Sequence, residues 1–475
     1  MLENIFKLKE NNTTVKTEII AGLTTFLTMA YVIALNPNIL TNYGAGGKQL
    51  WNGVFLATCI ASFIGMAAMA FLANKPFCLG PGMGINSFFA VVITNLIVIT
   101  GWDYVTSYQT VLCIVLIEGI VFLILSIFNI REKIVDAIPL GVRLGIAPAI
   151  GLMLMNIGFG SNIYMADANG NQYFMMRDFF GALTAKTIKD SMGDAYPTMV
   201  LSVITLFIGL FVIAALAHKG VKACVIIGIL AASCVYWIGE AIFLGINPFA
   251  ALSGMSFVPA FGDLFATTFL KFNFSGLASL GWFTIITLVI TFCMIDMFDT
   301  IGTLIGTASR VGMVDENGNM PNMKEALMAD AIGTVAGSCT GTSTITTFIE
   351  SAAGVEAGGR TGLTAITTGI LFLSCIFIAP IAAIIPAAAT SSALVYVGVL
   401  MILSLKNIDF SDLATAIPVS IMLIAMPISS SIGHAIGLGM ISNAVIMMTT
   451  GRGKEVSKLT YIISVLFIVK FFLAV

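Results

Sequence analysis

Apolar segments long enough to cross a bilayer recur along the whole chain, without a soluble domain between them. A helix needs about 20 apolar residues to span the hydrocarbon. Runs of that size are found at 17–36, 52–73, 110–130, 139–160, 198–217, 222–244, 280–305, 361–384 and 387–405. Shorter or interrupted candidates are found at 79–98, 325–339, 341–357, 412–427, 430–449 and 459–475. Since backbone polar groups in lipid must bond internally, we predict an all-α polytopic membrane protein with about fourteen spans.

The composition supports a membrane location and excludes several classes of protein. The chain is 58% hydrophobic and 10% charged, whereas soluble domains carry roughly 25% charged residues. Its net charge of −2 gives no reason to expect nucleic-acid binding. The eight cysteines stand singly, mostly inside apolar runs. They are therefore predicted to be small core residues, and neither a metal site nor a cofactor is expected.

Basic residues predict the orientation, because cytoplasmic loops carry an excess of Lys and Arg. Lysines precede the first span, and further basic residues follow even-numbered spans at Lys75, Arg131 and Lys219. We therefore predict a multi-pass protein of the cell (plasma) membrane with a cytoplasmic N-terminus. The loops 161–196 and 245–279 then face outside, and the side of the final run at 459–475 is left open.

Three acids lie in or beside stretches that are otherwise apolar. Asp296 and Asp299 belong to TFCMIDMFDTIG, and Glu350 belongs to GTSTITTFIESAAGV. An ionised carboxylate in hydrocarbon costs several kcal/mol, so such residues normally face a cavity, a partner or a ligand. Two carboxyls three residues apart nearly share a helix face, and they do not both ionise easily in a low dielectric. This arrangement suits a proton carrier.

Two weak segments, 77–92 and 338–355, occupy corresponding places in the two halves of the chain. Both begin with Gly, Pro, Ser or Thr and then become apolar, which is typical of transporter sites built from half-helices. The spacing between the halves predicts opposite orientations, and therefore an inverted repeat. A half-helix that starts inside the membrane leaves its first N–H groups available to a ligand. The candidate contacts for a small nitrogenous solute are Asn86, Asp296, Thr342, Ser343 and Glu350, with Phe298 and Phe348 as stacking walls.

Long motifs in these segments resemble those of a known family. GPGMGINSFFA, DMFDTIGTL and GTSTITTFIESAAGVEAGGRTGLTA are similar to the signature segments of the AzgA-like purine permeases. That family is a branch of the nucleobase/cation symporters, within the nucleobase–ascorbate transporter group. The opening TEIIAGLTTFLTMAYVIALNP is also similar. The resemblance extends from about Thr17 through the final apolar run.

The resemblance implies a specific architecture and activity. It implies seven plus seven inverted spans, with half-helices and short extended segments at the third and tenth spans. A core domain would comprise 17–130 and 280–385, and a gate domain would comprise 131–250 and 386–475, after a cytoplasmic tail at 1–16. The implied activity is import of adenine, guanine or hypoxanthine by proton symport, with alternating access produced by core-versus-gate movement. The expected partners are a purine nucleobase, the proton and the lipid bilayer, and a homodimer is left open.

The resemblance also assigns roles to individual residues. Asp296 and Glu350 match acids that contact the base, and Asn86 matches the polar residue of the third-span half-helix. Asp299 matches a second eighth-span acid with a less direct role, so that Asp296, Asp299 and Glu350 together would carry protons. Thr300 stands where the uracil-transporting branch has a histidine, which argues against uracil and against a histidine relay.

Other interpretations are retained for the same residues. The eighth-span acids could be a structural pair at a helix end, Glu350 could pair with Arg360, and Asn86 could make only an interhelical hydrogen bond. The unassigned polar residues are Glu118, Arg143, Asp330 and His434.

Four other functions compete with purine transport. An enzyme is disfavoured because the chain has two histidines and no Walker or GxSxG motif. A channel is disfavoured because the acids form a single locus rather than repeated pore rings. A uracil/xanthine-type nucleobase and a same-fold anion transporter are kept as alternatives.

Overall fold

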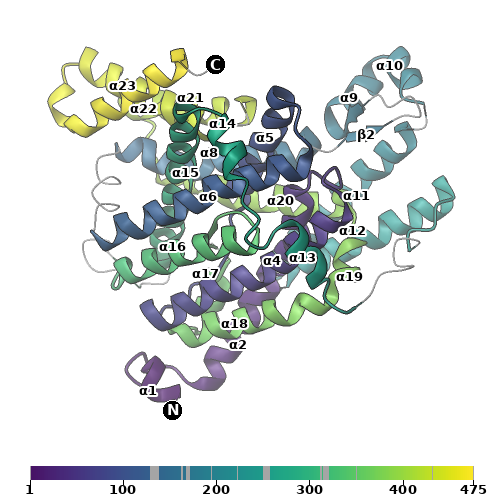
Figure 1. Cartoon of the computed structure of the whole chain (residues 1–475), viewed down its shortest axis with the longest axis horizontal. Helices are drawn as coiled ribbons and strands as arrows, with labels where there is room; N and C mark the ends of the chain where they lie inside the picture. Colours follow the sequence, from purple (N-terminus) through teal and green to yellow (C-terminus); the bar gives the residue numbers. More distant parts are fainter. Residues whose placement is uncertain are drawn as a thin grey trace.

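Helices build almost the whole molecule (Figure 1). The computed structural model describes residues 2–473 except 129–138, 162–163, 167–171, 194, 222, 250–256, 311–312, 314–319, 349 and 430–431. The helices are α1 (Leu2–Phe6), α2 (Val15–Met29), α3 (Val32–Leu40), α4 (Gly47–Ala68), α5 (Met83–Thr100), α6 (Tyr104–Ile127), α8 (Leu140–Asn156), α9 (Met175–Thr184), α10 (Lys186–Ser191), α11 (Ala195–His218), α12 (Cys224–Gly239), α13 (Phe261–Thr267), α14 (Phe274–Ser279), α15 (Trp282–Arg310), α16 (Met323–Thr340), α17 (Ser351–Glu356), α18 (Gly362–Ser374), α19 (Ala379–Ala383), α20 (Ala387–Ile402), α21 (Leu413–Ser429), α22 (Ile432–Thr449) and α23 (Lys458–Leu473). The strands are β1 (Leu79–Pro81), β2 (Tyr164–Ala166), β3 (Gln172–Phe174) and β4 (Ile345–Thr347).

The long apolar runs of the sequence form helices of membrane-spanning length. Within the described residues, nine helical stretches are long and apolar enough to cross a membrane, from Val15–Leu40 to Ala387–Asn407. Shorter apolar helices are found at Trp282–Met297, Leu413–Ser429, His434–Thr449 and Lys458–Val469. The prediction of a helical, multi-pass membrane protein is therefore confirmed.

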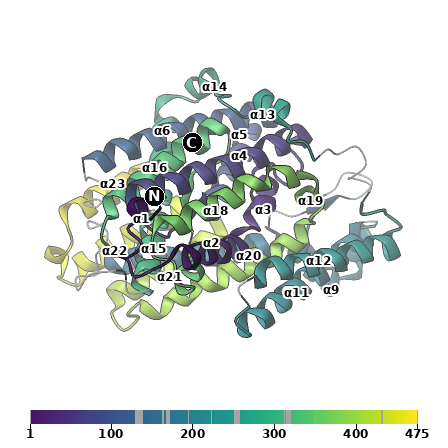
Figure 2. The ribbon, with the colours of Figure 1, turned by 90° about the horizontal axis from the view of Figure 1, so that it is seen from below.

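The helices pack in two groups. In the first group, α2 and α4 lie against α18, and α16 lies against α4 and α6; Figures 1 and 2 show α2, α4 and α18 side by side. In the second group, α8 lies against α20 and α21, and α11 lies against α12 and α20. The two groups meet along a seam where α8 touches α5 and α15, and α20 touches α3.

The two weak segments of the sequence meet as a pair of antiparallel strands inside the first group. β1 pairs antiparallel with β4, with Leu79 opposite Thr347 and Pro81 opposite Ile345. The pairing satisfies backbone groups that would otherwise be unpaired inside the membrane. Helix α5 begins just after β1, and α17 begins soon after β4. A Cβ atom on Gly82 would lie 2.6 Å from Cγ2 of Thr346, so the close approach of the two segments at this point favours a glycine.

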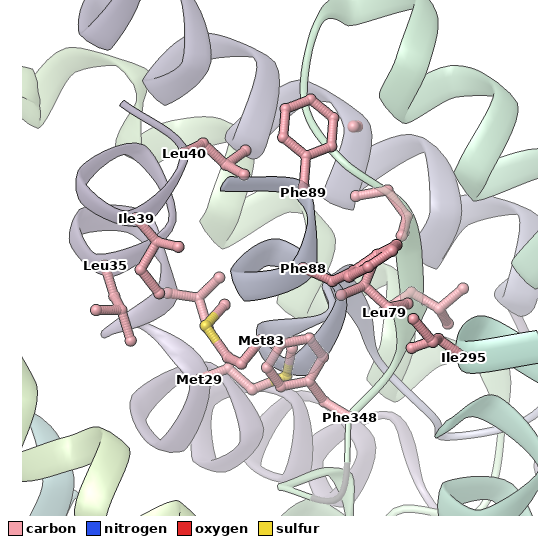
Figure 3. Close-up of a cluster of buried hydrophobic side chains, with 14 of the residues drawn as sticks. Met29, Leu35, Ile39, Leu40, Leu79, Met83, Phe88, Phe89, Ile295 and Phe348 are labelled. Atoms are coloured by element: carbon pink, nitrogen blue, oxygen red, sulfur yellow. The ribbon is translucent and has the colours of Figure 1, made fainter. Parts of the chain in front are cut away.

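Apolar side chains fix the start of α5 within the first group. Figure 3 shows Met83, Phe88 and Phe89 of α5 in a cluster with Met29, Leu35, Leu79, Ile295 and Phe348. Phe89 and Ile295 are fully buried. Since lipid is as apolar as these side chains, close packing rather than removal from water provides most of the stabilisation. The cluster holds the beginning of α5 at a defined depth.

Two segments predicted as loops contain regular structure. The segment 161–196 holds the β2–β3 hairpin, α9 and α10, and the segment 245–279 holds α13 and α14. In Figure 1, α9 and α10 lie at the edge of the molecule opposite α22 and α23. Helix α9 is amphipathic and buries Met175, Met176 and Ala182. A search for runs of spanning length overlooks such short helices, because each has at most three buried positions among its described residues.

Candidate functional site

A cavity of about 170 Å³ lies on the seam between the two groups of helices. One buried water needs about 10–15 Å³ on this scale, so the cavity has room for a small solute. The first group contributes Tyr31, Gly82, Met83, Gly84, Asp299, Thr303, Thr346, Thr347, Phe348 and Glu350 to its wall. The second group contributes Arg143, Ile146, Ala147, Ile150, Leu154, Val397, Leu400, Met401 and Ser404.

Glu350 reaches the cavity from the position before the first residue of α17. The hydroxyl of Tyr31 donates a hydrogen bond of 2.8 Å to its Oε1 atom. Tyr31 lies where α2 ends and α3 begins, and its side chain is buried. A residue more than 300 positions away therefore orients this carboxyl toward the cavity.

Asp299 and Thr303 line the cavity from successive turns of α15. Thr347 lines it from β4, and its hydroxyl is buried without a hydrogen-bond partner among the described residues. Phe348 forms an apolar wall beside Met83, as Figure 3 shows. The cavity thus offers carboxyl and hydroxyl groups together with an aromatic face.

The beginning of α5 forms another part of the wall. Gly82, Met83 and Gly84 all line the cavity. The first N–H groups of a helix have no partner within the helix, and they carry the positive end of its dipole. Hydrogen-bond donors from the backbone therefore complement the carboxyl acceptors of Asp299 and Glu350.

Asp296 lies behind the cavity wall in a buried polar cluster. The hydroxyl of Thr300 is 3.3 Å from Oδ1 of Asp296, 2.7 Å from Oδ1 of Asp330 and 2.6 Å from Oγ1 of Thr346. Thr346 itself lines the cavity, so hydrogen bonds connect the two aspartates to the wall. The part played by Asp330 was not predicted, although an acid within a short apolar run was a usable signal.

Asn86, Thr342 and Ser343 also lie behind the wall. Asn86 donates to Oδ1 of Asn36 at 2.6 Å and accepts a hydrogen bond from Ser343. Asn36 in turn donates to Thr342 at 2.9 Å and to Thr58 at 2.6 Å. These buried bonds join α3, α4, α5 and the segment before β4. These bonds agree with the interpretation in which Asn86 makes only interhelical hydrogen bonds. A contact between Asn86 and a solute stays a prediction.

The remaining candidate residues have the following places. The side chain of Phe298 lies outside the described part of the structure. Nη1 of Arg360 donates to the carbonyls of Val355 and Gly359 at 2.6 and 2.7 Å, so it closes the end of α17. Arg143 lines the cavity from α8. His434 packs on Phe471, with ring centroids 5.7 Å apart.

Two further buried glutamates hold the first group together. Oε2 of Glu118 accepts a hydrogen bond of 3.0 Å from Thr344. Glu18 accepts from the backbone N–H groups of Arg360, Thr361 and Thr364 and from the Thr364 hydroxyl, at 2.6–3.2 Å. It therefore caps the beginning of α18. Its sequence position near the first span was a weak signal, because a glutamate there could equally face water.

Comparisons with known proteins agree with this architecture. Residues 16–438 match the Permease family. Adenine permease AdeP of Escherichia coli (strain K12) is 37% identical over 473 residues, which cover 99% of this chain and 96% of AdeP. Guanine/hypoxanthine permease PbuO of Bacillus subtilis (strain 168) is 34% identical over 472 residues, which cover 99% of this chain and 100% of PbuO.

A solved structure shares the fold. The transmembrane domain of the cyanobacterium bicarbonate transporter BicA aligns with a TM-score of 0.60 at 15% identity, covering 88% of this chain and 96% of that domain. The family match and the end-to-end similarity to curated permeases agree with the motifs of the sequence. The chain therefore belongs to the Permease family, as one of the AzgA-like purine permeases, and is a membrane transporter rather than an enzyme.

Proposed function

We propose that this protein imports purine nucleobases by proton symport. The observation that carries the proposal is the cavity on the seam, where Asp299, Glu350 and the beginning of α5 from one helix group face Arg143 from the other. The printed names of the relatives AdeP and PbuO, an adenine and a guanine/hypoxanthine permease, support a purine as the substrate.

The proposed architecture is a repeat of seven plus seven spans. We assign the first helix group, 17–130 with 280–385, to the core domain, and the second, 131–250 with 386–475, to the gate domain. The antiparallel pairing of β1 with β4 supports an inverted relation between the halves. The N-terminus is placed in the cytoplasm of a plasma-membrane protein, and a homodimer is left open.

An ion pair supports the arrangement of the last spans. Nη1 of Arg452, after α22, lies 3.0 Å from Oδ2 of Asp412, before α21. The beginning of α21 and the end of α22 therefore lie on the same side of the molecule. Arg452 and its neighbour Lys454 favour the cytoplasm as that side.

In the proposed mechanism the base lies flat against Phe348. The carboxyls of Glu350 and Asp299 accept hydrogen bonds from its ring N–H groups, and the first N–H groups of α5 donate to its acceptor atoms. Asp296 does not contact the base in this mechanism. It influences the cavity wall through the hydrogen bonds of Thr300 and Thr346. A proton taken up by this group of acids removes a charge that is unfavourable in a low dielectric, which couples protonation to movement of the core against the gate.

Anion transport is the second candidate function, because the fold is shared with a bicarbonate transporter. Among the described residues, the cavity wall has two carboxyls, Asp299 and Glu350, and one arginine, Arg143. Two acids oppose the binding of an anion, so the composition of the wall favours a neutral base. A uracil/xanthine-type nucleobase is kept as an alternative substrate. Thr300 is the residue that argues against uracil.

Uptake into proteoliposomes tests the proposal. Labelled adenine, guanine, hypoxanthine, uracil and bicarbonate are supplied under an inward proton gradient, with and without a protonophore. We expect purine uptake that the protonophore abolishes. Uptake that follows sodium instead would refute proton coupling, and preferential uptake of uracil or bicarbonate would refute the substrate.

The variant Glu350→Gln tests the site itself. A hydrogen bond to a charged group contributes about 1.5–3 kcal/mol, so base affinity should fall roughly tenfold to a hundredfold. The control is Glu455→Gln, which changes an exposed glutamate that does not line the cavity. Unchanged affinity in a folded Glu350→Gln protein would exclude the proposed contact.

A further inference from the structure

A second cavity, of about 350 Å³, lies on the same seam between the helix groups. Its lining comes from the end of α3, the loop between α3 and α4, the beginning of α4 and the junction of α19 with α20. The lining residues are Asn38, Tyr43, Gly44, Gly47, Lys48, Trp51, Ala383, Ile385 and Ala387. Most of this lining belongs to the first helix group, and Ala387 belongs to the second.

The two cavities lie toward opposite ends of α20. Ala387, the first residue of the helix, lines the second cavity, and Met401, near its end, lines the first. At 1.5 Å per residue the two positions are about 20 Å apart along the helix. Residues 390–394 of α20 and Leu35 of α3 are fully buried between them. A closed stretch of the seam therefore separates the cavities.

One wall of the second cavity is a rigidly held indole. The Trp51 ring stacks on Phe55, with centroids 5.4 Å apart and an interplanar angle of 14°. Its Nε1 atom donates a hydrogen bond of 2.8 Å to Oδ1 of Asn38. This bond leaves the Asn38 amide nitrogen as a donor, and the exposed Lys48 ammonium provides another. The wall thus combines a flat aromatic surface with hydrogen-bond donors.

Tyr43 connects the two helix groups at this cavity. Its ring packs on the cluster of Met175, Met176, Val203 and Leu206 in the second group, although its backbone belongs to the first. The hydroxyl is buried without a hydrogen-bond partner among the described residues. The φ angle of Tyr43 is 51°, a left-handed conformation that is unfavourable for a bulky residue. An unpaired hydroxyl and an unfavourable backbone both indicate a residue held in place for a function.

We propose that the second cavity is the outer capture site of the transport path, and that it binds a planar heteroaromatic base before the base reaches the first cavity. This inference rests on the proposed function and names a second binding site for the same substrate class. The base stacks on Trp51 and directs an edge of ring nitrogen or carbonyl acceptors toward Tyr43, Asn38 and Lys48. The first cavity differs in that it also offers the carboxyl acceptors of Asp299 and Glu350 to the ring N–H groups.

The capture site also explains why Tyr43 bridges the groups. When the core and the gate separate at this end of the seam, the Tyr43 ring leaves its cluster in the second group. The cavity then joins the path that leads along α20 to Glu350. In the described state the ring keeps that path closed.

Protection from a thiol reagent tests the site. Lys48→Cys places a thiol in the cavity, and Gln49→Cys places one on the exposed neighbour that does not line it. Intact cells are treated with a membrane-impermeant thiol reagent, with and without adenine, guanine or hypoxanthine, and the unaltered protein gives the background from its native cysteines. We expect the base to slow labelling at 48 at least threefold and to leave labelling at 49 unchanged. Equal effects at both positions, or none at either, would overturn the capture site while leaving purine uptake in place.

The same measurement in Glu350→Gln separates the two cavities. Protection at 48 that persists in this variant supports an independent outer site. Protection that disappears would show that it arises from binding in the first cavity, and would overturn the inference. A failure of the unaltered protein to take up purines would instead refute the proposed function, and the ligand class of the capture site with it.

Substitution of Trp51 provides a second readout. Trp51→Leu removes the aromatic surface, whereas Trp51→Phe keeps a smaller aromatic ring and loses the bond to Asn38. Base–aromatic stacking predicts a rise of about tenfold in the external concentration that half-saturates uptake for Trp51→Leu, and a smaller rise for Trp51→Phe. The maximal rate should stay unchanged in both. Equal effects of the two variants, or a change in maximal rate alone, would contradict a stacking role.

Discussion

Removing the hydroxyl of Tyr31 is expected to weaken base binding about tenfold. This hydroxyl donates the 2.8 Å hydrogen bond that orients Glu350 toward the cavity. The Tyr31 side chain is 3% exposed, so water cannot easily replace the hydroxyl on that side. Phenylalanine has nearly the same shape, and Tyr31→Phe therefore removes the bond without opening a large gap in the core.

The size of the effect follows from the surroundings of Glu350. A hydrogen bond to a charged group contributes about 1.5–3 kcal/mol when both groups are shielded. Glu350 is only half-buried and lines the cavity, so a water molecule can compensate part of the loss. We therefore expect the lower value, about 1.5 kcal/mol, which corresponds to roughly a tenfold change in affinity.

Equilibrium binding of a labelled purine to purified variants measures the effect. A double-mutant cycle with Glu350→Ala isolates the coupling, because Tyr31→Phe should then change affinity by less than about twofold. The control is Tyr108→Phe, which removes a buried hydroxyl that donates to the Gly341 carbonyl at 2.8 Å, away from the cavity. It should lower thermal stability without changing affinity. Additive effects of the two substitutions, or equal loss of affinity in Tyr31→Phe and Tyr108→Phe, would refute the reasoning.

Further substitutions test the site and its support. Asp299→Asn is expected to weaken base binding directly, because Asp299 lines the cavity, whereas Asp296→Asn, behind the wall, should mainly lower uptake and shift its pH dependence. Binding and uptake measured on the same preparations distinguish the two roles, and the reverse pattern would show that the assignment is the wrong way round. Gly82→Ala should lower the free energy of unfolding by about 1–3 kcal/mol through overpacking. Adding Thr346→Ser removes the clashing methyl group and should restore the melting temperature. A melting temperature that stays low in the double variant would contradict the clash. Glu18→Gln should cost about 1.5–3 kcal/mol, since a carboxylate that accepts several backbone N–H groups is lost, and an unchanged melting temperature would exclude the cap.

The long helices and the two interrupted segments were predictable because their signals are local. A run of about 20 apolar residues can satisfy its backbone in lipid in only one way. Glycine and proline before Met83 mark a break wherever the segment lies in the fold. The pairing of β1 with β4 was not predictable in the same way, because its register depends on contacts between residues far apart in the sequence.

The position of each side chain around its helix was the least predictable property of the site. Asp296 and Asp299 differ by three residues, so they point about 60° apart around the helix. This rotation places Asp299 on the cavity and Asp296 behind it, and only the packing of α15 against its neighbours sets it. Tyr31 gave no signal at all, since a tyrosine in an apolar run usually serves packing.

The pairing of β1 with β4 has a consequence for the synthesis of the protein. Strand β4 lies roughly 270 residues after β1 in the chain. At about 5–20 residues per second, the ribosome completes β4 some 15–50 s after β1 has entered the membrane. During that interval the backbone of Leu79 and Gly80 lacks its final hydrogen-bond partners, so the first half of the chain must wait in a partly assembled state. The binding cavity, whose lining comes from both halves of the chain, therefore forms only after the second half has been inserted.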